Sequence, residues 1–403
     1  MLKPEHELWE DSQKTLLEKN FKQIVTICGD GHLKDDTDCS RELRNILARV
    51  EAEKLFEYVN YCIEQPFEKS GQALQDVINE LGRRLGYEVE NGLYGGRVNK
   101  SGQDGIWLDR DIGSIILEAK TSDTYMISLD KLIEYRNKSV ASGKVEAGAS
   151  ILIVVGRENT GGLEAQIRGS RHAWDIRIIS VKALCDLVKL NMKSDEVETS
   201  EKIRTLFKPI EYTRIDALID VVFTAVEDVD SDDTSSIEDG ETSIDSEETG
   251  GVRKQEHTPR MIQDRLRSRA ANSLAKKLKK DFIAQRRTEF LSIDKSVLAV
   301  ALVSKVYVGG NLQSLWFGLH PKQVKNLSHY DQGFLLLASV QNDLLFALDI
   351  KMLQPLIPRM NKTEGEKRVH WHIDIRIRDD GYFLTLKNGE TIDISNNRVS
   401  LVN

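Results

Sequence analysis

Apolar residues in the first half of the chain alternate between helical and strand spacing. Segments with helical spacing are 67–86, 129–142 and 183–192. Apolar runs typical of buried strands are 115–117, 151–155 and 176–181. A short strand at 87–91, a hairpin and a short basic helix near 161–171 complete the series. The order predicts an α/β fold with a mixed central sheet flanked by helices.

The second half of the chain begins with a helical pattern and continues as strands. One basic helix is predicted over 253–291, with an apolar stripe of Ile262, Leu266, Ala270, Leu274, Leu278, Phe282 and Phe290. The predicted strands are 297–308, 313–319, 334–340, 344–348, 370–377, 382–386 and 391–394. This pattern indicates a separate α+β domain, mainly antiparallel β.

Charge separates the two halves. From Glu227 to Glu248 there are eleven acidic residues and no basic one, whereas Arg253 to Arg287 contains twelve Lys or Arg against three Asp or Glu. The acidic segment is predicted to be a flexible linker; folding over a basic groove as a DNA mimic is the less favoured alternative. The predicted organisation is a helical N-terminal flank (1–66), an α/β domain (67–225), the linker (226–252) and a C-terminal basic helix with a β-rich domain (253–403).

The overall composition predicts a cytoplasmic protein without a membrane segment. The 403 residues are 40% hydrophobic and 30% charged, with no apolar run long enough for a bilayer and no basic-then-apolar leader. The four cysteines lack zinc-type spacing, so they are expected to be reduced. The net charge of −8 argues against nucleic acid, but the twelve-to-three basic block at 253–287 favours phosphate contact.

Gly102–Lys120 is predicted to be a β-hairpin that carries a metal site. Asp104 opens the first strand, the turn lies at 111–113, and the second strand ends in Glu118-Ala119-Lys120. Alternation places Glu118 and Lys120 on one face, where a charged pair is costly to bury unless it is paired or binds a metal. A simple ion pair between them is the alternative reading.

Asp104, thirteen intervening residues and Glu118-Ala119-Lys120 resemble the PD-(D/E)XK nuclease superfamily, with its restriction endonuclease-like fold, over about residues 67–190. The proline that usually precedes the aspartate is replaced by Gln103. The resemblance implies Asp104, Glu118 and Lys120 as catalytic residues. Asp104, Glu118 and the Ala119 carbonyl would hold Mg²⁺, or Mn²⁺ in its place.

A further metal ligand in this superfamily often comes from the preceding helix. Glu80 and Gln75 are the candidates, and an ordinary surface role is an equal alternative for both. Seven residues are proposed to contact DNA, with solvated surface as the alternative for the first three: Gln166, Arg168, Arg171, Arg265, Arg269, Lys276 and Lys280.

The resemblance implies a Mg²⁺-dependent DNA endonuclease of the prokaryotic restriction or antiphage-defence type. It is expected to act as a homodimer or larger oligomer, with a separate motor or sensor subunit as a possible partner. The alternative is a nucleic-acid-binding or scaffolding subunit whose nuclease domain is inactive alone. RNA is a third substrate option.

Two other patterns have a chemical reading and a plainer one. His370, His372 and Asp374 alternate along one strand and could bind a metal, but a polar sheet face is the favoured reading. Trp316 could be a stacking platform for a base, but a strand leaving a core is favoured.

Overall fold

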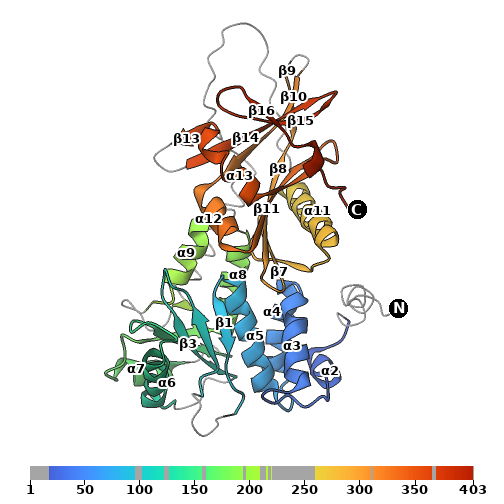
Figure 1. The fold of residues 1–403 in the computed structure, drawn as a ribbon. Coiled ribbons are helices and arrows are strands. Elements are labelled where there is room, and N and C mark those ends of the chain that lie inside the picture. Colours follow the sequence, from blue (N-terminus) through green and yellow to red (C-terminus); the bar gives the residue numbers. More distant parts are fainter. Residues whose placement is uncertain are drawn as a thin grey trace.

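The computed structural model describes residues 18–95, 102–121, 127–156, 160–193, 197–208, 215, 216, 219, 259–309, 312–364 and 369–402. The predicted acidic linker, 226–252, lies outside the described residues. Figure 1 shows an α/β unit at the lower end and two β-sheets at the upper end.

Four helices form the N-terminal part of the α/β unit: α2 (Phe21–Ile27), α3 (Asp38–Arg49), α4 (Ala52–Glu64) and α5 (Ser70–Arg84). Asn20 begins α2 with a capping box and the Thr37 side chain caps α3, so polar residues set both starts. The helices share one hydrophobic core with α8 (Val181–Lys193) and one face of the sheet. The predicted helical flank is therefore packed directly on the α/β domain.

The central sheet has the order β1-β2-β3-β4-β5. Its strands are β1 (Glu88–Asn91), β2 (Gly105–Leu108), β3 (Ile115–Lys120), β4 (Ser150–Val155) and β5 (Ile176–Ser180). The first three pair antiparallel, whereas β3-β4 and β4-β5 pair parallel. β4 is buried along its whole length, as its continuous apolar run predicts.

Helices cover both faces of this sheet. α5 and α8 lie on one face, while α6 (Leu129–Ala141) and α7 (Gly161–Arg168) contribute to a second core on the other. The chain continues into α9 (Val197–Thr205). The predicted mixed α/β architecture is confirmed.

The C-terminal part contains two sheets with a core between them. The first has the order β12-β11-β8-β7-β6, and the second β16-β15-β14-β10-β9, with β13 paired to β14. The first contains β6 (Phe282–Ala284), β7 (Glu289–Ser292), β8 (Val297–Ser304), β11 (Gln332–Ser339) and β12 (Leu345–Asp349). The second contains β9 (Val306–Gly309), β10 (Leu312–Leu319), β13 (Lys362–Glu364), β14 (Val369–Arg378), β15 (Gly381–Thr385) and β16 (Thr391–Asp393).

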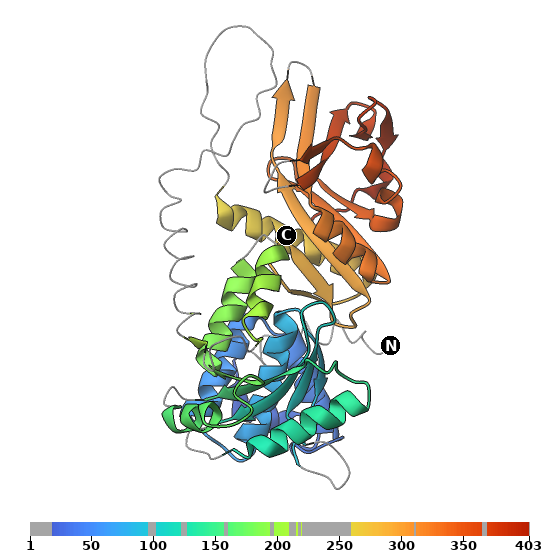
Figure 2. The same ribbon diagram turned by 90° about the vertical axis from the view of Figure 1, so that its left-hand side faces the viewer.

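One long helix and several shorter helical segments complete this part. They are α11 (Arg260–Leu278), α12 (Pro321–His329), α13 (Ile350–Leu353) and 3-10 turns at Ile357–Arg359 and Ser395–Asn397. α11 packs against β8 and β11 on the side away from the second sheet (Figure 2). Among the described strands of this part, all pairings are antiparallel except β8 with β11, so the expected mainly antiparallel fold is confirmed.

Two predicted elements are wrong in extent. The basic helix ends at Leu278 rather than 291, because Lys279 adopts a left-handed conformation at φ 56°. Phe282 and Phe290 lie on β6 and β7. The strand predicted over 297–308 divides at Lys305 into β8 and β9, which belong to different sheets.

Charged contacts join the two parts of the molecule. Lys322 Nζ lies 2.7 Å from Glu201 Oε2, and Arg49 Nε lies 3.8 Å from Asp281 Oδ2. Within the described residues, no helix has both the length and the apolar character needed to cross a membrane.

Candidate active site

Two amides of α5 hold the main chain where the predicted site begins. Gln75 Nε2 and Asn79 Nδ2 each donate a hydrogen bond to the Asp104 carbonyl oxygen, both at 2.9 Å. The Gly92 N–H donates to the same oxygen at 3.0 Å. A Cβ at Gly92 would lie 2.1 Å from the Gln103 carbonyl, so this approach requires glycine. Asn79 also accepts from Trp107 Nε1 at 3.0 Å, which fixes its amide.

The Asp104 carboxylate turns from this anchor toward β3. Its Oδ2 accepts the Ala119 N–H at 2.7 Å, just beyond the last β2-β3 pair. Lys120 Nζ lies 2.6 Å from Glu118 Oε1. The structure thus brings Asp104, Glu118 and Lys120 together at one end of the hairpin.

Two acidic side chains, Asp104 and Glu118, lie close together in this partly buried site. Burial, and then the nearby Glu118 carboxylate, raises the pKa of Asp104 to about 7, while the Ala119 N–H and Lys120 act in the opposite direction. Glu118 is 8% exposed, and its Oε2 is buried without a hydrogen-bond partner among the described residues. A buried carboxylate oxygen without a donor is costly.

These groups fit a hard cation. No group of three or more His, Cys, Asp or Glu side chains suited to a metal occurs in the described part of the chain. Magnesium nevertheless needs only one or two carboxylates, because it keeps several waters. The N–H and C=O of one strand residue point to the same edge, so the Ala119 carbonyl lies on the Asp104 side. A cation there would give the unsatisfied Glu118 oxygen a partner.

The two candidates on α5 have different surroundings. Gln75 is 4% exposed and contacts the Asp104 main chain. Glu80 is instead held by Arg84 Nε at 3.0 Å and Arg83 Nη1 at 3.2 Å. Arg84 in turn donates to the Val50 carbonyl at 2.8 Å, so Glu80 belongs to a network joining α5 to the corner between α3 and α4. Gln75 is the candidate adjacent to Asp104.

Sequence reasoning missed Asn79, Lys131 and Tyr135. The Tyr135 hydroxyl lies against Gly102, because a Cβ there would be 2.8 Å from it. Lys131 is exposed, and the pKa of its ammonium is raised first by a hydrogen bond with Tyr135 and, more weakly, by Glu118. The four-residue spacing of Lys131 and Tyr135 on the predicted helix was the available signal. Their proximity to Asp104 and Glu118 depends on packing that the sequence does not display.

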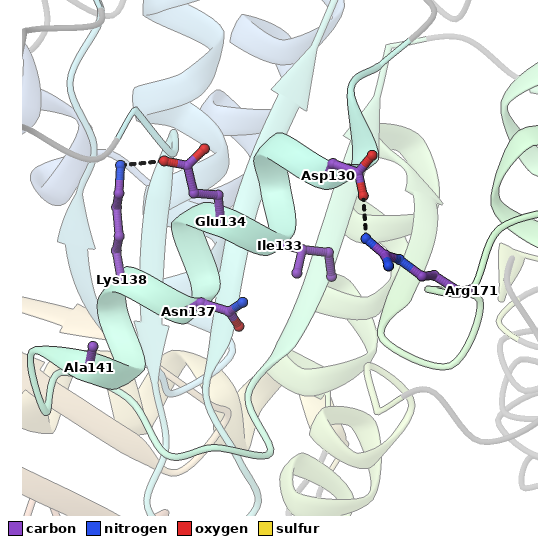
Figure 3. Close-up of a pocket in the computed structure, with 7 residues that line it drawn as sticks. All are labelled: Asp130, Ile133, Glu134, Asn137, Lys138, Ala141 and Arg171. Carbon is purple, nitrogen blue, oxygen red and sulfur yellow. Dashed lines mark hydrogen bonds and ion pairs between the residues drawn. The ribbon is translucent and has the colours of Figure 1, made fainter.

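The predicted DNA contacts near α7 are engaged with neighbouring groups. Gln166 donates to the Ile127 carbonyl at 2.7 Å, and Arg168 lies 3.6 Å from Glu164. Arg171 pairs with Asp130 at 3.3 Å beside a surface pocket of about 480 Å³ (Figure 3). Acidic and basic side chains both line this pocket. Its lining residues are Asp130, Ile133, Glu134, Asn137, Lys138, Ala141 and Arg171.

The C-terminal DNA candidates divide into two groups. Arg265 and Lys276 are exposed on α11. Arg269 Nε donates to the Val402 carbonyl at 3.0 Å. Lys280 lies past the end of the helix, where it pairs with Asp294. Intramolecular contacts therefore occupy part of the basic block.

Comparison with protein-family models gives no match, and no curated protein is significantly similar to this chain.

Proposed function

We propose that this protein is a Mg²⁺-dependent DNA endonuclease with a restriction endonuclease-like domain. The observation that carries the proposal is the Asp104 carboxylate bonded to the Ala119 N–H, with Glu118 Oε2 unsatisfied beside it. The order α5-β1-β2-β3-α6-β4-α7-β5, with β3 at the change from antiparallel to parallel pairing, also supports this fold. The antiphage setting, the homodimer and a separate motor subunit stay predictions from the sequence.

The resident cation would be held by the Asp104 and Glu118 carboxylates and the Ala119 carbonyl. When bound, it would neutralise charge at the phosphate and lower the pKa of a water molecule. In hydrolysis, the water oxygen bonds to phosphorus while the bond from phosphorus to one sugar oxygen breaks. The leaving sugar oxygen then takes a proton.

The side chains have distinct parts in this reaction. Lys120, held beside Glu118, can orient the attacking water and stabilise negative charge that develops on the phosphate. Gln75 and Asn79 keep the Asp104 main chain fixed, so its carboxylate needs little reorganisation. Lys131 and Tyr135, at the edge of the site, are suited to contact a neighbouring phosphate.

Cleavage of supercoiled plasmid DNA in Mg²⁺ tests the proposal. Lys120→Ala is expected to lower the cutting rate by about 100-fold or more, in the range for a positioned proton-transfer or charge-stabilising group. Lys138→Ala is the matched control, because Lys138 also lies 2.6 Å from a glutamate but on the outer side of α6. The control should retain wild-type activity within about twofold.

Binding of plasmid without cleavage would favour the alternative function, a nucleic-acid-binding or scaffolding subunit. If wild-type protein binds plasmid in both EDTA and Mg²⁺ but never cuts it, a binding or scaffolding subunit is favoured. If Lys120→Ala and Lys138→Ala cut at the same rate, the assignment of Lys120 is wrong.

A further inference from the structure

The outer face of the second C-terminal sheet carries side chains that the core does not use. On β14, Ile373 and Ile375 are fully buried between the two sheets. Strand alternation therefore directs His372 and Asp374 outward. Trp316 on β10 is opposite Asp374 in the register, so it lies on the same face, where it is 40% exposed.

Aromatic and imidazole rings on this face contact one another. Trp316 meets His372 and His370 edge-on, with ring centroids 5.3 and 5.9 Å apart. His370 and His372 stack at 5.3 Å with an interplanar angle of 17°, and His320 lies 5.7 Å from His370. The Thr363 hydroxyl bonds to His372 Nε2 at 2.6 Å, which restricts that ring. Because the rings are already ordered, a planar ligand would immobilise little additional side-chain freedom.

A neighbouring row across the same face adds rings and cations. Tyr307, Ser314, Arg376 and Phe383 are successive register partners on β9, β10, β14 and β15. Tyr307 is 38% exposed. The guanidinium of Arg378 lies 4.7 Å from the centre of the Phe383 ring. Two aromatic rings and two arginines therefore share this side of the sheet, and the row ends at Asp393 on β16.

We propose that this outer face binds single-stranded nucleic acid, with a base stacked on Trp316 and phosphates near Arg376 and Arg378. Bases of any sequence have a π-face, and only a single strand leaves those faces uncovered for a protein ring. Asp374 and Asp393 carry the opposing charge on this face, and Arg376 and Arg378 match it in number. A protein partner would bury the Asp374 carboxylate in an interface core, where aspartate is depleted.

The proposal goes beyond the proposed nuclease function and does not depend on it. Binding is measured in EDTA by fluorescence anisotropy, with full-length protein and a labelled oligothymidine of about 15 nucleotides. Trp316→Ala should raise Kd by about 5- to 140-fold, the range expected when one base loses its stacking partner. Trp174→Ala is the matched control, since Trp174 is 69% exposed on the α/β unit, and its Kd should equal that of wild type.

Two further variants separate stacking from a folding defect. Trp316→Phe keeps a ring and should restore most of the affinity. Arg378→Gln should reduce the slope of log K against log salt by about 0.7, as expected for one phosphate contact on a single strand. Because strand binding is measured in EDTA and cutting is measured in Mg²⁺, failure of cutting and failure of strand binding remain distinguishable.

Three results would overturn the proposal. Trp316→Ala could bind as tightly as Trp174→Ala, or duplex DNA could compete as strongly as the single strand. Alternatively, light scattering could show that Trp316→Ala turns a dimer into a monomer while oligothymidine binding is unchanged. The last result would assign the face to contact between two copies of this chain.

Discussion

The buried carboxyl group of Asp104 makes folding stability depend on pH in a defined direction. Its pKa is raised to about 7 in the folded protein, whereas Asp in an unfolded chain titrates near about 3.9. Between these values the folded protein retains a proton that the unfolded chain has lost. The free energy of unfolding therefore falls as the pH rises from about 4 to about 7. The contribution of Asp104 to folding stability is least favourable above that range, where its carboxylate is charged.

Asp104→Asn removes this charge while keeping an oxygen that can accept the Ala119 N–H. One pKa unit corresponds to about 1.36 kcal/mol, so a shift of about three units gives an upper limit of about 4 kcal/mol. In EDTA at pH 8, the variant should have a Tm several degrees above that of the wild type. A change of about 1 kcal/mol in the free energy of unfolding shifts Tm by about 2–4 °C for a folded domain of this size. At pH 5 both side chains are neutral and the two melting temperatures should nearly coincide.

Thermal melts followed by circular dichroism at the two pH values measure this effect. Mg²⁺ at pH 8 should raise the Tm of the wild type and have little effect on Asp104→Asn, because only the wild type keeps both carboxylates. Asp111→Asn is the control, since the Asp111 side chain is 87% exposed in the same hairpin, and it should match the wild type. The reasoning is refuted if Asp104→Asn shifts Tm equally at pH 5 and pH 8, or if Mg²⁺ stabilises both proteins equally.

Two further predictions concern the packing of α5 behind the site. Asn79→Ala should lower the free energy of unfolding by about 1–3 kcal/mol, since the buried indole N–H of Trp107 loses its acceptor. Urea denaturation measures this, with Asn137→Ala on the exposed side of α6 as a control; equal midpoints for the two variants would contradict the role of Asn79. Gly82→Ala should cost about 1–3 kcal/mol in the same assay, because a Cβ there would lie 2.4 Å from the Trp107 ring. Gly71→Ala in the same helix meets only an ordinary 3.8 Å contact and should be neutral or slightly stabilising, so similar losses in both would argue against overpacking.

The arrangement of side chains on the hairpin could be predicted because it depends on local rules. Strand alternation predicts that Glu118 and Lys120 share one face, and the structure brings Asp104 beside them. The role of Asn79 could not be predicted in the same way. It depends on how α5 packs against β2, which contacts between residues distant in sequence determine. No local sequence pattern distinguishes a buried Asn on a helix from other helical Asn residues.

The C-terminal errors have a related cause. Phe282 and Phe290 continue the apolar spacing of α11 by coincidence, and Lys279 gives no glycine signal for the end of the helix. The division at Lys305 is likewise invisible, because residues on both sides favour strands and only the surrounding sheets determine which one each residue joins. In the C-terminal part, hydrophobic spacing predicts whether a segment is a helix or a strand. Contacts with residues distant in sequence determine where each element ends.

The three N–H groups that converge on the Asp104 carbonyl separate the framework of the site from its chemistry. Gln75, Asn79 and Gly92 hold the peptide, and none of these three bonds uses the carboxylate. Under the proposed nuclease function, a protein that has lost the carboxylate should therefore keep its shape while being unable to cut. Such a variant would serve as a trap in cells, holding its nucleic acid uncleaved so that the captured strands can be recovered and sequenced.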